Sequence, residues 1–206
     1  NAIFEGLRSP SRCLGLHFFS PAHVMKLLEV IRAKTTSEAT LATAFGLADR
    51  LRKIPVEAGV CDGFIGNRIL TRYRQTTDVL LIEGALPAEV DAALEGFGMA
   101  MGPYAVQDLS GLDIAYANRQ RKGLRHRSDI LYVPIADQMV EGLKRLGRKT
   151  KAGWYDYPEG ARQPSGVVDD LVRAASAAAG ITRQAFTAEA IVGRAMLAMI
   201  EEGLHI

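Results

Sequence analysis

The spacing of apolar residues in this 206-residue chain changes near residue 60, and that change limits the folds open to it. Before it, two short apolar runs, residues 14–19 and 24–31, lie on either side of a Ser-Pro pair, as in two strands joined by a turn. The stretch "TTSEATLATAFGLADRLRKI" then opens with Thr and Ser before Glu and continues with apolar residues at helical intervals. Because "IPVEAGV" follows as a further strand, the first 60 residues predict a βαβ-like unit.

Beyond residue 60 the pattern predicts helices. Asp62 can cap a long, mostly buried helix, and "LPAEVDAALEGFG" has the first-turn Pro and terminal Gly of another. "PYAVQDLSGLDIAYANRQR" and "VPIADQMVEGLKRLG" predict two more helices, joined by a polar loop near residues 121–130. After an irregular stretch from Lys149, helices return at Val167 and Ala188. The predicted fold class is therefore α+β or mainly α.

Composition excludes several classes of protein. Lys plus Arg is 25 and Asp plus Glu is 23, so nucleic-acid and membrane-surface binding have little support. Cys13 and Cys61 stand far apart, which indicates neither a disulfide framework nor a zinc site. No apolar stretch approaches the roughly 20 residues that span a bilayer, and the first residues lack the order of a signal peptide. We expect a cytoplasmic or organelle-matrix protein, and the start "NAIFEGLRSPSR" without Met suggests a fragment.

Three glycines in "GFGMAMG", Gly96, Gly98 and Gly102, suggest a dinucleotide-binding loop at first sight. That fingerprint needs a preceding strand, GxGxxG spacing and a helix directly afterwards. Here the glycines follow a predicted helix, contain an extra residue and run into Pro103. We interpret them as a helix C-cap and a turn, so the chain shows no nicotinamide-binding loop.

His17 ends one apolar run and Glu29 lies in the next. The plain interpretation of His17 is a partly buried imidazole bonded to the backbone, which periodicity alone favours. The alternative is a general base, because ligands gather at strand ends in α/β layers and Glu29 could accept a hydrogen bond from the far ring nitrogen. Such a carboxylate fixes the tautomer and stabilises the cationic ring.

Two more polar residues are candidates for substrate contact. Asn67 lies about one turn inside the helix that Asp62 opens, where its amide can donate to a carbonyl oxygen, although Asn is ordinarily a surface or cap residue there. Ser20 could act likewise, although Ser before Pro is usually a turn residue. Metal binding is not indicated, because His17 and His23 do not share a helical face and no Cys/Asp cluster accompanies them.

Two other patterns have structural interpretations. The aromatic stretch "GWYDY", with Trp154, Tyr155 and Tyr157, is interpreted as packing that holds a loop on the helices. "IGNRIL" at residues 65–70 is echoed weakly by "IVGRAM" at residues 191–196, which is consistent with a duplicated helical unit.

Four motifs in this order, "GLHFFSPAHVMKLLEV", "DGFIGNRIL", "GFGMAMGPYAVQDLSGLD" and "GRKTKAGWYDY", closely resemble the 3-hydroxyacyl-CoA dehydrogenase family. The resemblance covers nearly the whole chain and is strongest to the dehydrogenase part of multifunctional β-oxidation proteins. It implies a Rossmann domain followed by a helical domain, with a second helical unit in the multifunctional proteins.

The resemblance also implies a reaction and the residues that perform it. The family moves a hydride between C3 of an L-3-hydroxyacyl-CoA and NAD. By position, His17 would take the hydroxyl proton and Glu29 would steady it. Asn67 of "GFIGNR" would position the substrate near its thioester carbonyl. Ser20 stands where relatives have Ser or Asn, so a substrate contact there is an expectation as well.

The matching motifs imply a division of the chain. Residues 1–60 would be the last part of an NAD-binding Rossmann domain, residues 61–160 the helical dehydrogenase domain, and residues 161–206 a linker and the start of a second helical unit. The family's glycine-rich NAD loop is not found, so no cofactor-binding residue can be named. We expect these 206 residues alone to be inactive and a full-length parent to use NAD.

The expected partners are a 3-hydroxyacyl-CoA substrate and either a second copy of the chain or hydratase and thiolase parts of a β-oxidation complex. Two alternatives stay open: a helical dimerisation or domain-docking module, and a non-catalytic, crystallin-like relative. Retention of His17, Glu29 and Asn67 together favours the enzyme.

Overall fold

The computed structural model describes residues 2–127 and 131–206, which fold as two compact units. Residues up to Leu70, together with Glu202–Ile206, form the strand unit, and Thr71–Glu201 form the helical unit. The predicted combination of a strand-bearing first part and helices after it is confirmed. The last three residues of the predicted loop near residues 121–130, residues 128–130, lie outside the described residues.

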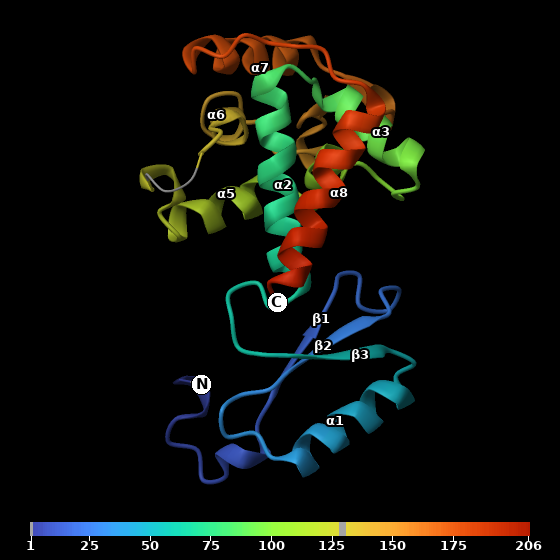
Figure 1. The fold of residues 1–206 in the computed structure, drawn as a ribbon, viewed down its shortest axis with the longest axis vertical. Coiled ribbons are helices and arrows are strands. Elements are labelled where there is room, and N and C mark those ends of the chain that lie inside the picture. Colours follow the sequence, from blue (N-terminus) through green and yellow to red (C-terminus); the bar gives the residue numbers. More distant parts are fainter. Residues whose placement is uncertain (1, 128–130) are drawn as a thin grey trace. The chain divides into compact units, whose positions relative to one another are not determined.

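The strand unit contains a three-stranded sheet in the order β1-β2-β3 (Figure 1). β1 is antiparallel to β2, and β2 is parallel to β3 across helix α1. The predicted βαβ-like unit is therefore present, but its strands are shorter than predicted. The N–H of Val24 donates to the carbonyl of Pro21, so the residues before β2 form a turn. The elements of this unit are β1 (Gly15–Phe18), β2 (Leu27–Ile31), α1 (Glu38–Arg50) and β3 (Ile54–Ala58), with 3-10 turns at Ala2–Phe4 and Pro10–Arg12.

One face of the sheet packs on α1. Leu28 and Val30 of β2 meet the apolar side of the helix in a cluster with Leu41, Ala44 and Ala48. Ser37 caps α1 by accepting the N–H of Thr40, as the Thr/Ser signal before Glu predicts. Because side chains alternate along a strand, Glu29, which lies between Leu28 and Val30, projects from the other face.

The helical unit is built around two long helices that lie side by side, α2 and α8 (Figure 1). An ion pair between Glu83 near the end of α2 and Arg194 of α8 joins them. The elements that follow β3 are α2 (Gly66–Glu83), α3 (Pro87–Phe97), α4 (Pro103–Ser110), α5 (Leu112–Arg121), α6 (Ile135–Glu141), β4 (Tyr155–Asp156), β5 (Gln163–Pro164), α7 (Gly166–Ala178) and α8 (Ala188–Leu204), with 3-10 turns at Leu124–His126, Arg148–Thr150 and Pro158–Gly160.

Three predicted helix boundaries were wrong. The helix after β3 begins at Gly66 rather than beside Asp62, because residues 62–65 form a turn. The stretch from Pro103 was predicted as one helix but forms two, because Gly111 adopts φ +95 and ends α4. The helix predicted for "VPIADQMVEGLKRLG" stops at Glu141, well before the end of that stretch.

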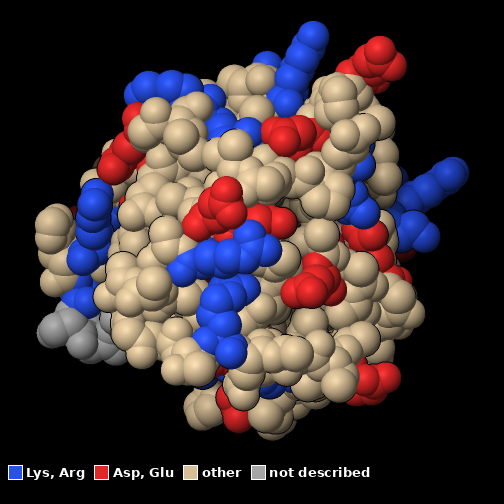
Figure 2. Space-filling model, turned by 90° about the horizontal axis from the view of Figure 1, so that it is seen from above, with Lys and Arg blue, Asp and Glu red and all other residues tan. Residues whose placement is uncertain are grey.

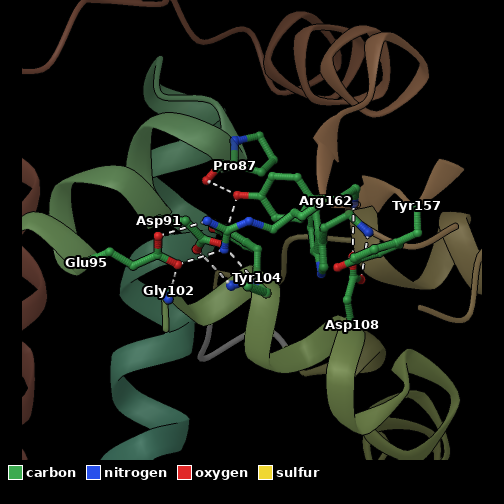
Figure 3. Close-up of polar contacts among 11 residues, drawn as sticks. Pro87, Asp91, Glu95, Gly102, Tyr104, Asp108, Tyr157 and Arg162 are labelled. Carbon is green, nitrogen blue, oxygen red and sulfur yellow. Dashed lines mark hydrogen bonds and ion pairs between the residues drawn. The ribbon is translucent and has the colours of Figure 1, made fainter. Parts of the chain in front are cut away.

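Buried carboxylates tie the aromatic stretch to the helices (Figure 3). Asp108 of α4 accepts the N–H groups of Trp154 and Tyr155, at 2.8 and 3.0 Å, and the hydroxyl of Tyr157 at 2.9 Å. All three aromatic side chains are buried, which confirms the packing interpretation. Burial raises the pKa of Asp108, although these donors oppose the shift.

A second buried carboxylate, Asp91 of α3, holds the start of α4. Its Oδ1 accepts the N–H of Tyr104 at 3.0 Å and its Oδ2 accepts the N–H of Ala105 at 2.9 Å. The Tyr155 hydroxyl donates to Oδ2 at 2.8 Å. Burial raises the pKa of Asp91 to about 6. A Cβ on Gly102 would lie 2.2 Å from the Asp91 Cγ, so glycine allows this close approach.

Two of the three glycines of "GFGMAMG", Gly98 and Gly102, lie in this region. Gly98 is the C-cap of α3 with φ +122, and Gly102 is the N-cap of α4, so the predicted C-cap and turn are confirmed. Arg162 forms a bidentate ion pair with Glu95, with N···O distances of 2.7 and 2.8 Å. Glu95 also accepts a hydrogen bond from the Gly102 N–H (Figure 3). The hydrogen bonds from Arg162 lower the pKa of Glu95 to about 2.

Charges of both signs are interspersed on the face drawn in Figure 2, in keeping with the net charge of +2. Within the described residues, no helix combines the length and the apolar character that crossing a bilayer requires.

Candidate active site

The strand register brings His17 and Glu29 together. His17 of β1 lies directly opposite Glu29 of β2 in the antiparallel ladder, on the sheet face that does not pack on α1. The His17 Nδ1 lies 2.5 Å from the Glu29 Oε2. The expected hydrogen bond from the far ring nitrogen is therefore present, while the catalytic role stays a prediction.

Glu29 is held from its other side by the start of α2. Its Oε1 accepts the backbone N–H groups of Ile65, at 3.0 Å, and Gly66, at 2.7 Å. The side chain is 1% exposed, and unpaired N–H groups at a helix N-terminus favour a negative charge there. Both donors use one oxygen, so the other oxygen is left for His17.

Two aromatic rings contact the imidazole. The Phe19 ring centroid lies 4.8 Å from that of His17, and the Phe64 centroid lies 5.4 Å away, both in tilted arrangements. The His17 side chain is 28% exposed, so it is neither fully buried nor free in solvent. With Nδ1 directed at Glu29, Nε2 is the nitrogen that can exchange a proton with a ligand.

The two other predicted site residues lie close in sequence to this pair. Asn67 is the second residue of α2, directly after the Gly66 N–H that Glu29 accepts, and it is exposed. Its position at the helix start differs from the predicted place one turn inside the helix. Ser20 is exposed in the turn after β1, where it precedes Pro21 in a cis peptide bond. Their roles in substrate binding stay predictions.

Sequence reasoning missed the residues that surround the pair. Phe64 and the N–H groups of Ile65 and Gly66 contact His17 and Glu29 from a turn whose backbone is left-handed, with φ +82 at Gly63 and φ +49 at Phe64. The Asp-Gly pair at residues 62–63 is the one available signal, because it is typical of turns.

The arrangement fits acid–base chemistry. A carboxylate is hydrogen-bonded to one nitrogen of a partly exposed imidazole, which leaves the second nitrogen for proton transfer. Among the described residues, no group of three or more His, Cys, Asp or Glu side chains is placed to hold a metal ion.

Gly98 and Gly102 do not form a site that fits NAD. Gly98 and Gly102 bound a turn between two helices, and the space beside Gly102 is filled by Asp91. We therefore assign no step that involves NAD to these glycines. His17 and Glu29 can hold and move a proton, but Gly98 and Gly102 do not form a pyrophosphate-binding loop.

Two family models match the chain in order. Residues 1–61 match the model described as 3-hydroxyacyl-CoA dehydrogenase, NAD binding domain, and residues 63–157 match its C-terminal domain. The chain is 39% identical to a peroxisomal bifunctional enzyme of Danio rerio, over all of this chain and 30% of that protein. It is 37% identical to a fatty acid oxidation complex subunit alpha of Psychrobacter arcticus, over 97% of this chain and 28% of that subunit.

Solved structures agree with these similarities. The dehydrogenase part of multifunctional enzyme 1 from C. elegans superimposes with a TM-score of 0.73 and 32% identity, over 98% of this chain and 46% of that one. A 3-hydroxybutyryl-CoA dehydrogenase from Escherichia coli gives 0.68 and 33%, over 80% of this chain and 35% of that one. The chain spans 23% and 30% of the length of the first two curated relatives it matches.

Proposed function

The chain belongs to the 3-hydroxyacyl-CoA dehydrogenase family, and on that premise we propose that its His17–Glu29 pair moves the proton when an L-3-hydroxyacyl-CoA is oxidised to the 3-oxoacyl-CoA. The observation that carries this proposal is the Glu29 carboxylate, bonded at once to His17 and to the start of α2. NAD supplies the hydride acceptor of this chemistry in the family.

In the proposed step, the Nε2 of His17 takes the proton of the C3 hydroxyl. The ring becomes cationic as it does so, and the Glu29 carboxylate stabilises the positive charge through Nδ1–H. Because Glu29 is buried and held by two N–H groups, it needs no reorganisation during the step.

We propose substrate-positioning roles for Asn67 and Ser20. The Asn67 amide, at the start of α2, is suited to donate to the thioester carbonyl. Ser20, three residues after His17, is suited to contact the substrate. The division into residues 1–60, 61–160 and 161–206 belongs to this proposal, as does a cytoplasmic or organelle-matrix location.

The described residues offer no phosphate-binding loop for NAD, so we propose that the 206 residues do not turn over alone. The test therefore uses a protein in which this chain is joined to a GxGxxG-bearing βαβ unit. There, His17→Gln should lower turnover by about 10³-fold with little change in KM for the acyl-CoA. His126→Gln, an exposed histidine of the helical unit, is the matched control and should keep full turnover. Unchanged turnover in His17→Gln, or a loss confined to KM, contradicts the proposed base.

A second proposal concerns self-association of the helical unit. Leu197 and Ile200 of α8 are each more than half exposed, and Leu197 lines a hollow of about 410 Å³ between α2 and α8. Sedimentation across a range of concentrations tests this proposal. A strict monomer contradicts it, and association that Leu197→Glu abolishes supports it.

A further inference from the structure

Phe64 has a backbone conformation that non-glycine residues rarely adopt. Its φ is +49, and Gly63 before it has φ +82. A left-handed conformation is unfavourable for an L-residue, so it persists only where the surroundings fix it, often at functional sites. Two hydrogen bonds close the turn, from the Phe64 N–H to the Cys61 carbonyl at 3.3 Å and from the Cys61 thiol to the Phe64 carbonyl at 3.2 Å.

The side chain of this turn contacts the proposed base. The Phe64 ring lies against the His17 imidazole, with centroids 5.4 Å apart and planes at 53°. Phe19 contacts the same imidazole from β1. Ring contacts of this kind limit rotation of the imidazole and so preserve the direction of Nε2.

The backbone of the turn contacts the other member of the pair. After the left-handed residue, the next two N–H groups, of Ile65 and Gly66, both point at the Glu29 Oε1. The same bend therefore brings a ring to His17 and two donors to Glu29. An extended Phe64 would change the direction of the N–H groups that follow it.

We propose that Phe64 is a positioning residue for the His17–Glu29 pair, acting through its ring on His17 and through its left-handed backbone on Glu29. The inference rests on the proposed function, because it assigns Phe64 a part in that reaction. Phe64 acts through His17 and Glu29, so its contribution is orientation. Misorientation of a proton-transfer group reduces turnover more than it reduces binding.

The kinetic test uses the NAD-competent protein, which is the one that joins this chain to a GxGxxG-bearing βαβ unit. Phe64→Leu keeps apolar volume but removes the flat ring, and it should lower turnover about tenfold while KM for the acyl-CoA stays within about twofold. Phe64→Tyr keeps the ring and should restore most of the turnover. Phe97→Leu, at the exposed last residue of α3, is the matched control and should change neither value. Normal turnover in Phe64→Leu overturns the inference.

A spectroscopic test separates positioning from packing and needs no catalysis. In the 206-residue chain, nitrogen-15 NMR should show that His17 carries its proton on Nδ1. Proton NMR should show a far-downfield Nδ1–H signal from the hydrogen bond to Glu29. Phe64→Leu should weaken that signal and Phe64→Tyr should retain it. If Phe64 only packs, Phe64→Leu lowers the unfolding midpoint and leaves the signal intact, which contradicts the proposal. If Phe64→Leu fails to fold, Phe64→Met takes its place with the same expected results.

The two proposals fail in different ways. If His17→Gln abolishes turnover and Phe64→Leu does not reduce it, only the positioning inference is wrong. If His17→Gln leaves turnover unchanged, the proposed function is wrong, and the inference fails with it whatever the NMR signal shows.

Discussion

Glu29 in the strand unit and Asp91 in the helical unit are buried carboxylates held in similar ways. Each is 1% exposed and accepts two consecutive backbone N–H groups, Glu29 at the start of α2 and Asp91 at the start of α4. They differ in how the donors are shared. Both donors meet one oxygen of Glu29, whereas Asp91 receives one donor on each oxygen. One oxygen of Glu29 is therefore free of backbone donors, whereas each oxygen of Asp91 accepts one.

The third partner decides what each carboxylate can do. The spare oxygen of Glu29 meets a half-exposed imidazole that has a second nitrogen, so a proton can be exchanged there. Asp91 accepts a hydrogen bond from the buried Tyr155 hydroxyl. Burial raises the pKa of Tyr155, so this hydroxyl keeps its proton. Backbone N–H groups at a helix start bond to both carboxylates, but of the two only Glu29 is bonded to an imidazole.

The largest effect is expected from Glu29→Gln. The glutamine oxygen can still accept the two N–H groups, but its NH₂ would then face the His17 Nδ1 and force the proton onto Nε2. Nε2 would no longer be free to act as a base, so turnover should fall by about 10³-fold. Steady-state kinetics in the NAD-competent protein measure this loss. Turnover within about twofold of the original would show that the pairing is structural.

The next largest effect tests the other side of the comparison. Asp91→Asn must place its NH₂ against a backbone N–H, because both oxygens of Asp91 accept one. It should lower the free energy of unfolding by about 3 kcal/mol, as measured by urea denaturation. Asp170→Asn, at a highly exposed residue, should change it by less than about 1 kcal/mol. If Glu29→Gln destabilises the chain as much as Asp91→Asn does, the contrast between the two sites is wrong.

A pH-dependent effect concerns a carboxylate that lacks this support. The buried Oδ1 of Asp78 on α2 has no hydrogen-bond partner among the described residues, and burial raises the Asp78 pKa to about 7 from 3.8, although Arg119 and Arg74 oppose the shift. Between these values the folded chain binds more protons than the unfolded chain, so this carboxylate makes stability fall as pH rises. Between pH 4 and 7 this carboxylate should lower the free energy of unfolding, measured by urea denaturation, by an amount on the order of a few kcal/mol. Asp78→Asn should remove that decrease. An equal slope in both proteins contradicts the assignment.

Strand periodicity was enough to predict that His17 and Glu29 lie on neighbouring strands, but it did not decide between a backbone-bonded imidazole and a pairing with Glu29. Short apolar runs on either side of a Ser-Pro turn imply neighbouring strands, and each polar residue falls where an antiparallel register places it on one face. The burial of the aromatic stretch was predictable as well, since three large rings within four residues, 154–157, need a core.

Backbone conformation explains what the sequence could not reveal. The support of Glu29 depends on Phe64 at φ +49, and propensity disfavours that conformation for Phe. The helix break at Gly111 was missed because one glycine inside a helical pattern is often tolerated. Asp62 looked like an N-cap because the turn at residues 62–65 that delays α2 is not visible in residue spacing.

The central claim is that His17 and Glu29 act as one unit, and a double-mutant cycle tests it most directly. Turnover of His17→Gln, Glu29→Gln and the double variant is compared in the NAD-competent protein. If Glu29 acts only through His17, the double variant is no slower than His17→Gln alone. Losses that multiply, with the double variant slower than His17→Gln by the full factor of Glu29→Gln, would contradict the account.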